Sequence, residues 1–287
     1  MRYLIILILM PLIQLATRKI FHFILPGPYE FWQTYCMIFL QHFFSIGVPM
    51  WLLYPKKEYY ISQKKASAPK GDLFRFVVLG FCMQLIGTAL NYPFSMLLQH
   101  LGYPLPPSLP NPMNGLEFLL QTLVVCLTPA ILEEILFRQL IYREISGYSR
   151  SGAVFYSALF FSVAHFDLFN LPATFFIGLS LGILRTRNVS LSKCCIVHFI
   201  INFTASLLNV GFNFAAFSEL FNRYYPLSIF LSVVLYIAIF PKGHSVASDV
   251  SEDKTVAVRK SYTGKLLKNP LFYLYCILFF FIGVNQL

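Results

Sequence analysis

Residues 119–142 read LLQTLVVCLTPAILEEILFRQLIY, an apolar run that holds two adjacent glutamates and an arginine. Apolar runs of about 20 residues are typical of membrane-spanning helices, and such runs recur along the whole chain. Of its 287 residues, 57% are hydrophobic and only 12% are charged, which is unlike a soluble domain. The sequence therefore predicts an all-α, polytopic transmembrane helix bundle with Glu133, Glu134 and Arg138 inside it.

We expect about eight or nine membrane segments in a single membrane domain that occupies residues 1–287. They cover roughly residues 3–25, 30–54, 73–98, 116–142, 153–166, 171–185, 194–216, 226–240 and 270–286. The first segment lacks the small-residue cleavage site of a signal peptide, so we interpret it as a retained span. Arg18 and Lys19 interrupt its apolar pattern, and its second half is expected at the membrane interface.

The net charge of +10 comes from basic residues between the apolar segments. Basic loops at 55–75 and 241–268 alternate with neutral loops such as 100–115, a pattern that places the basic loops in the cytoplasm. Residues 241–268 are expected to be a flexible, polar cytoplasmic loop. Residues 217–225, with one Arg and one Glu, are expected to be a loop between two spans. This distribution indicates a lipid bilayer, and not nucleic acid, as the partner of the positive charge.

The six cysteines all lie in apolar segments, and none forms a CxxC pair. This pattern supports neither a disulfide framework nor a cysteine zinc site.

Two apolar segments, 153–166 and 171–185, are too short to cross a hydrocarbon core of about 30 Å. We expect them to form a hairpin whose turn, DLFNLP at 167–172, ends inside the membrane. Irregular backbone is tolerated there only where it lines protein or a water-filled cavity, so the sequence predicts a cavity near this turn. His165 lies at the deep end of the hairpin. Asp167 either orients His165 or caps the turn.

Ionisable side chains inside membrane spans are costly and usually functional. Glu134 and Arg138 are four residues apart on one helical face, in the favourable order for an ion pair that supports the site. Glu133 points to another face and is left as a free carboxylate. A histidine beside it could orient a water that Glu133 deprotonates as general base.

His198 and Asn202 are also four residues apart on one face and offer N–H donors for a carbonyl oxyanion. Together with Glu133 and His165 they make up a candidate catalytic set. Phe161 is expected to be a packing residue that holds the helix of His165 in place.

Three motifs occur in order on separate segments: EEILFR (133–138) fits EExxxR, FSVAH (161–165) fits FxxxH, and HFIIN (198–202) fits HxxxN. In this order they resemble the CAAX-protease and bacteriocin-processing (CPBP, Abi) family of intramembrane glutamic endopeptidases, over about residues 115–215. The resemblance implies a catalytic core in that range, with a cavity open to the cytoplasm, in a multi-pass protein of a bacterial plasma membrane. It also implies a membrane-tethered or prenylated protein or peptide as substrate.

The resemblance further implies that Glu133 and His165 activate water and that His198 and Asn202 form the oxyanion hole. No cofactor is expected under this interpretation. Zinc held by Glu133, His165 and His198 is an alternative, because three such ligands leave a fourth position open. A transporter or proton relay and a non-catalytic bacteriocin-immunity protein of the same fold are further alternatives. No internal repeat of the kind that many transporters contain is evident.

Overall fold

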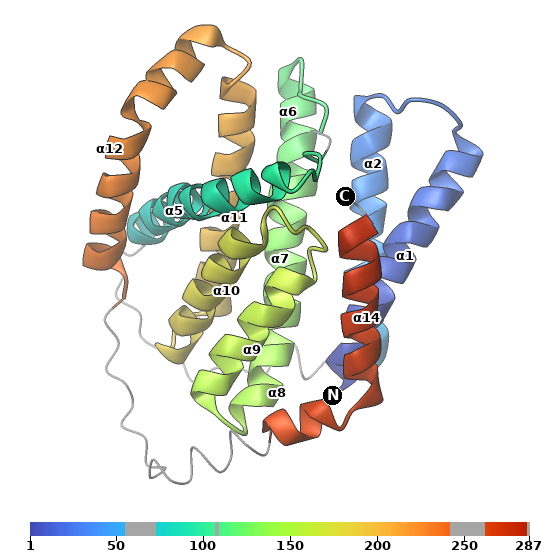
Figure 1. Cartoon of the computed structure of the whole chain (residues 1–287). Coiled ribbons are helices and arrows are strands. Elements are labelled where there is room, and N and C mark those ends of the chain that lie inside the picture. The colour runs from blue at the N-terminus through green and yellow to red at the C-terminus, as the bar shows by residue number, and fades with distance from the viewer. Residues whose placement is uncertain (55–72, 107–108, 242–261, 286–287) are drawn as a thin grey trace.

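The computed structural model describes residues 1–54, 73–106, 109–241 and 262–285, and every regular element in these ranges is helical (Figure 1). The helices are α1 (Arg2–Ile24), α2 (Phe31–His42), α3 (Val48–Leu53), α5 (Leu73–His100), α6 (Gly115–Gln121), α7 (Thr128–Glu134), α8 (Tyr142–Ser146), α9 (Arg150–Val163), α10 (Leu171–Thr186), α11 (Leu191–Gly211), α12 (Ala215–Ile239) and α14 (Pro270–Asn285). Residues 262–267 form a further short helix.

Three π-helical segments join some of these helices into longer rods. They are η1 (Phe43–Gly47) between α2 and α3, η2 (Thr122–Leu127) between α6 and α7, and η3 (Ile135–Ile141) between α7 and α8. The chain therefore runs as one continuous helix from Gly115 to Ser146.

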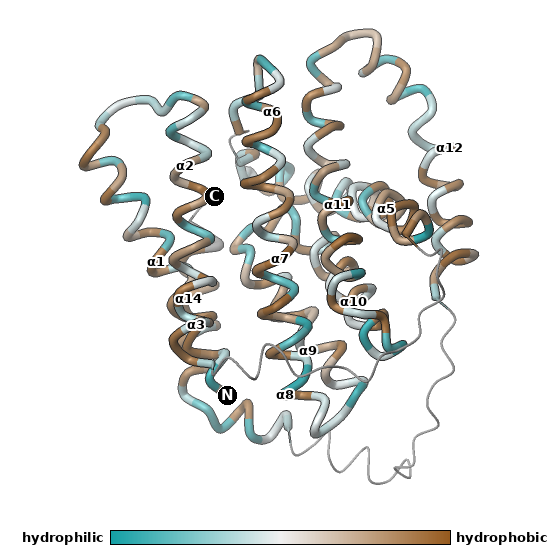
Figure 2. The backbone as a smooth tube through the Cα atoms, turned by 180° about the vertical axis from the view of Figure 1, so that it is seen from behind, coloured by the Kyte–Doolittle hydropathy of each residue, from teal (hydrophilic) through white to brown (hydrophobic). Residues whose placement is uncertain are grey.

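Six helices in the described part of the chain are long and apolar enough to cross a membrane. They are Arg2–Ile24, Phe31–Leu53, Leu73–His100, Gly115–Ser146, Leu191–Gly211 and Ala215–Ile239, and the shorter apolar helices include Leu171–Thr186 and Pro270–Ile282. Figure 2 shows apolar residues along most of α5, α7 and α10. These features confirm the prediction of a polytopic helical membrane protein.

The bundle has two outer groups of helices (Figure 1). One group contains α1, α2 and α14, and the other contains α5, α10, α11 and α12. The rod α6–α8 and helix α9 lie between the two groups, and α9 packs on α10. Helix α5 crosses α10 and α11 at a steep angle and packs against both. This close crossing depends on Gly80, where an added Cβ would lie 2.8 Å from the Val197 carbonyl oxygen.

The expected short hairpin is present as α9 and α10. In its turn, Phe166 has a positive φ of 51°, and the Asp167 carboxylate accepts hydrogen bonds from the backbone N–H groups of Phe169 and Asn170. Asp167 therefore caps the turn, one of the two roles expected for it. Asn91 of α5 accepts a hydrogen bond from the Ala173 N–H at 2.9 Å, which fixes the start of α10. The location of this turn inside the membrane stays a prediction.

The prediction of a loop at residues 217–225 is wrong, because α12 begins at Ala215. Phe217, Phe221 and Tyr225 recur every four residues, and successive rings lie 5.8 and 5.2 Å apart. Such aromatic pairs on one face favour a helix over residues 217–225, and α12 continues through Pro226 in its interior.

Helix α1 likewise continues through Arg18 and Lys19 without a break. Its buried residues all lie between Tyr3 and Pro11, so its second half packs little against the rest of the protein.

The polar segment 241–268 lies mostly outside the described residues. At its end, residues 262–267 are helical, and the Tyr262 hydroxyl hydrogen-bonds the Tyr3 hydroxyl of α1. This part of the segment is therefore ordered and packed, contrary to the expectation of a flexible loop up to residue 268.

Candidate functional site

Three elements carry the candidate residues to one place in the bundle. Glu133 and Glu134 are the last two residues of α7, and Arg138 lies in η3 directly after them. His165 follows the end of α9, and His198 lies in α11. The change from α- to π-helical geometry occurs at Ile135, beside the two glutamates, and such changes are frequent at functional sites.

Glu134 lies at the buried centre of the site and contacts two partners. Its Oε1 accepts a hydrogen bond from His198 Nδ1 at 3.0 Å. Its Oε2 lies 3.4 Å from Arg138 Nε, and the side chains of both residues are fully buried. Arg138 also points Nη2 to the Gly178 carbonyl oxygen of α10 at 3.5 Å. The expected pair of Glu134 and Arg138 is therefore present, and it is anchored to two further helices.

Glu133 is positioned differently from its neighbour. Its Oε2 lies 3.9 Å from His165 Nε2 and 3.9 Å from His198 Nε2. These distances exceed those of hydrogen bonds. The same oxygen is buried and has no hydrogen-bond partner among the described residues. Glu133 thus presents an unused carboxylate oxygen to two imidazole rings.

Both imidazole rings are oriented through Nδ1. His165 Nδ1 is 2.7 Å from the Phe161 carbonyl oxygen, which only accepts, so this nitrogen donates. His198 Nδ1 faces the Glu134 carboxylate in the same way. The two Nε2 atoms are therefore the nitrogens that face Glu133. The His165 side chain is 31% exposed, against 4% for His198, so access to the site is from the His165 side.

Phe161 is a packing platform for the whole site. Its ring centroid lies 4.2 Å from the Arg138 guanidinium carbon, a cation–π contact. The rings of His165 and His198 meet it edge-on, with centroids 4.8 and 5.6 Å away. Phe161 therefore fixes three polar groups and contributes its backbone carbonyl to a fourth contact, which is more than the packing role expected from the sequence.

Asn202 lies on α11, one turn beyond His198, and is half-buried. Its side chain forms no hydrogen bond within the described part of the chain, so its amide is available to a substrate. The structure places Glu133 beside both His165 and His198. Asn202 is near them because it lies one helical turn from His198 on α11.

Sequence reasoning missed the hydrogen bond between Glu134 and His198. These residues are 64 positions apart, and no local spacing links them. The EE pair itself was the available signal, since two adjacent carboxylates at the end of a helix can approach one ring from two directions.

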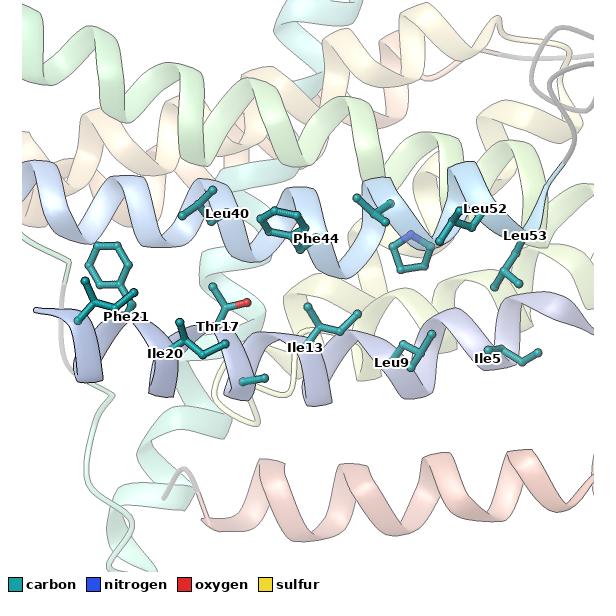
Figure 3. Close-up of a pocket in the computed structure, with 14 residues that line it drawn as sticks. Ile5, Leu9, Ile13, Thr17, Ile20, Phe21, Leu40, Phe44, Leu52 and Leu53 are labelled. Atoms are coloured by element: carbon teal, nitrogen blue, oxygen red, sulfur yellow. The ribbon is translucent and has the colours of Figure 1, made fainter.

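Three hollows in the described part of the chain border α1, and one of them is lined by a candidate catalytic residue. A groove of about 600 Å³ runs between α1 and α2–α3, and apolar side chains such as Leu9, Ile13 and Phe44 face each other across it (Figure 3). It contains none of the candidate catalytic residues. A smaller pocket of about 190 Å³ is lined by His165 together with residues of α1, α2 and α14.

Zinc requires ligands that surround one point at about 2.0–2.2 Å. Ligands at that distance around a tetrahedral metal lie about 3.3–3.6 Å apart, and here the Glu133 oxygen lies 3.9 Å from each imidazole nitrogen. Over the described ranges, no group of three His, Cys, Asp or Glu side chains has a metal-binding arrangement. The donor types suit zinc, but their spacing in this structure does not, and no step of the chemistry below uses a metal.

The fold and the site together define a helical membrane protein with a carboxylate–imidazole centre between its helices. Residues 115–204 match the sequence model of the Rce1-like family, described as type II CAAX prenyl endopeptidase Rce1-like. This segment contains all three motifs, and the match confirms the family that they indicate. At the level of the family, the activity is that of a CAAX-type intramembrane protease. No curated protein and no solved structure matches the chain.

Proposed function

We propose that the chain is an intramembrane endopeptidase that hydrolyses a peptide bond in a membrane-tethered or prenylated protein or peptide. The observation that carries this proposal is the unbonded Glu133 Oε2, 3.9 Å from two imidazole Nε2 atoms. An unpaired buried carboxylate is costly, and a reaction that uses it explains its presence.

The proposed nucleophile is a water between Glu133 and His165. Hydrogen bonds to water are about 2.8 Å long, so one water can contact two atoms that are 3.9 Å apart. His165 Nε2 accepts one hydrogen of this water and Glu133 Oε2 accepts the other. Glu133 takes the proton as the water oxygen attacks the carbonyl carbon, and it then returns that proton to the leaving amine.

Asn202 and His198 would bind the oxyanion that forms on the carbonyl oxygen. The Asn202 amide donates directly. His198 already donates Nδ1–H to Glu134, so it donates from Nε2 only as an imidazolium. Fixed donors aimed at a developing oxyanion contribute about 10²–10³-fold each to turnover.

Glu134 and Arg138 are positioning residues in this mechanism. Glu134 holds His198 in its tautomer and orientation, and Arg138 compensates the Glu134 charge. We further propose that the reaction is metal-free and that substrate enters from the cytoplasmic side, where the basic loops are expected.

The test is cleavage of a quenched fluorescent peptide by the purified chain in lipid nanodiscs. One reporter carries an S-farnesylated cysteine and a second carries an N-terminal acyl chain, so that both kinds of membrane tether are sampled. Glu133→Gln should lower turnover by at least about 10²-fold. The matched control is Glu219→Gln, which removes an exposed glutamate of α12 and should leave turnover unchanged. Full turnover by Glu133→Gln would refute the mechanism, and solute uptake into proteoliposomes without cleavage would favour a transporter.

A further inference from the structure

A polar pocket of about 530 Å³ lies between the start of α1, the end of α3 and the rod α6–α8. Arg2 is the first residue of the candidate span Arg2–Ile24, and Tyr54 directly follows the candidate span Phe31–Leu53. The pocket is therefore at the ends of two spans, which is the level of the lipid headgroups in a bilayer. We call it the basic pocket, and its polar lining residues are Arg2, Tyr54, Gln139, Arg143 and Glu144.

Two arginines give the basic pocket its positive charge. The Arg2 guanidinium carbon lies 5.6 Å from the centroid of the Tyr54 ring, a cation–π contact. Arg143 of α8 is exposed, and its guanidinium forms no hydrogen bond or ion pair with any described residue. Glu144 is the acidic residue in the described lining, and its Oε1 lies 3.0 Å from the backbone nitrogen of Met1. The arginines outnumber the carboxylate, so the pocket favours an anion.

The apolar groove between α1 and α2–α3 begins directly beside the basic pocket. Arg2 donates a hydrogen bond to the Leu53 carbonyl oxygen at 3.2 Å, and Leu53 lines the groove. Ile5, about one helical turn after Arg2, lines the groove as well. Figure 3 shows Ile5 and Leu53 at one end of the groove and Phe21 at the other. Pocket and groove thus form one continuous surface that is charged at the headgroup level and apolar beyond it.

The groove has the dimensions of lipid acyl chains. Its α1 wall runs from Ile5 to Ile24, about 28 Å at about 1.5 Å per residue. A hydrocarbon core is about 30 Å thick, so each leaflet contributes about 15 Å. The half of the groove next to the arginines, from Ile5 to Ile13 on α1, therefore matches the chains of one leaflet. The groove volume of about 600 Å³ is within the range of about 300–1,000 Å³ in which clefts hold small molecules.

We propose that the basic pocket and the apolar groove together bind one anionic glycerophospholipid. Arg2 and Arg143 bind its phosphate group, because guanidinium groups pair with phosphate oxygens through parallel hydrogen bonds. Its acyl chains lie in the groove against Leu9 and Leu52. Basic pockets between membrane spans bind anionic lipid headgroups in this way. The lipid site is separate from Glu133 and does not depend on the proposed peptidase function.

The experiment is a titration of the delipidated chain, followed by native mass spectrometry. The three probes are dipalmitoyl phosphatidylglycerol, dipalmitoyl phosphatidylcholine and glycerol 1-phosphate. Phosphatidylglycerol should bind at least about 10-fold more tightly than phosphatidylcholine, whose choline cation is repelled by the arginines. Glycerol 1-phosphate should bind most weakly, since it has no acyl chains to bury. Equal affinity for the two lipids, or tight binding of glycerol 1-phosphate, would overturn the proposal.

The decisive variant for the headgroup is Arg143→Gln, with Arg150→Gln as its matched control. Arg150 is an exposed arginine at the start of α9 and does not line the basic pocket. Arg143→Gln should weaken phosphatidylglycerol binding by about 10–100-fold, as expected for one charge-assisted interaction, and leave phosphatidylcholine unaffected. Arg143→Lys should restore part of the loss because it restores the charge. An unchanged affinity of Arg143→Gln, or an equal loss in Arg150→Gln, would refute the role of the pocket.

The variant for the groove is Leu9→Trp, with Leu12→Trp as its control. Leu9 lines the groove, whereas Leu12 is an exposed residue of α1 that does not. Leu9→Trp fills the groove and should weaken phosphatidylglycerol binding, and Leu12→Trp should not. Equal binding by these two variants would refute the groove as the site of the acyl chains. A dimer of the chain that Leu9→Trp disrupts, with no bound phospholipid, would overturn the proposal in favour of a second copy as the occupant.

Discussion

The variants Glu133→Gln and Glu134→Gln provide the sharpest test of the different roles of the two adjacent glutamates, one catalytic and one structural. Both changes keep the size of the side chain and remove one negative charge. Glu134 lies 3.4 Å from Arg138, and both are fully buried. At an effective dielectric constant of about 20, unit charges at this distance attract by about 5 kcal/mol. Removal of one partner from a buried ion pair typically costs about 3–5 kcal/mol, because the other charge stays buried.

We therefore expect Glu134→Gln to lower the free energy of unfolding by about 3–5 kcal/mol. Glu133→Gln should change it by less than about 1 kcal/mol, because Glu133 Oε2 has no hydrogen bond to lose among the described residues. Turnover should fall in both variants, but for different reasons. Glu133→Gln removes the base and abolishes cleavage in a stable protein, whereas the protein with Glu134→Gln loses activity together with stability.

The assay is reversible unfolding in mixed micelles of increasing SDS content, followed by tryptophan fluorescence, beside reporter cleavage on the same preparations. Arg138→Met is the companion variant, since it leaves Glu134 buried without its cation and should be comparably destabilising. A protein with Glu134→Gln that unfolds at the wild-type SDS content would refute the reasoning. So would a Glu133→Gln protein that is as unstable as we expect of Glu134→Gln.

Three further predictions concern the oxyanion site, the metal and the helix packing. Asn202→Ala should lower kcat by about 10²–10³-fold with little change in stability, and an unchanged kcat would remove Asn202 from the mechanism. Incubation with EDTA or 1,10-phenanthroline should leave cleavage unchanged, and a loss that zinc restores would make Glu133 and the two histidines metal ligands. Gly178→Ala places a Cβ 2.9 Å from the Ala158 Cα and should destabilise the hairpin by about 1–3 kcal/mol in the SDS titration. Gly264→Ala, with open space around it, is the control, and equal stability of the two variants would contradict this packing argument.

Helix type and most helix positions could be predicted from the sequence, because apolar runs with a known minimum length signal membrane spans directly. The short hairpin was predictable for the same reason, since its two segments are visibly too short to cross a bilayer. The extension of α12 back to Ala215 was not, because Glu219 and Arg223 interrupt the apolar pattern there. Aromatic contacts between successive turns support the helix over these residues.

The candidate site shows a similar limit. Spacing along one helix pairs Glu134 with Arg138, and the structure contains that pair. No spacing indicates that Glu134 also holds His198, or that the Phe161 ring contacts Arg138, because these contacts join different helices. Local patterns thus identify which residues are unusual, whereas the packing of α7, α9 and α11 decides which of them meet.

The π-helical turn at Ile135–Ile141 has a consequence for length mutations. A π-helical turn holds more residues than the roughly 3.6 of an α-helical turn, so deletion of one of residues 135–137 would let this segment close as an α-helix. Arg138 would then lie three residues after Glu134, a spacing that still places both side chains on one helical face. The wide turn is therefore a place where the rod could lose a residue and keep its charge pair. A scan of substitutions preserves the residue count throughout, and only insertions and deletions would reveal this tolerance.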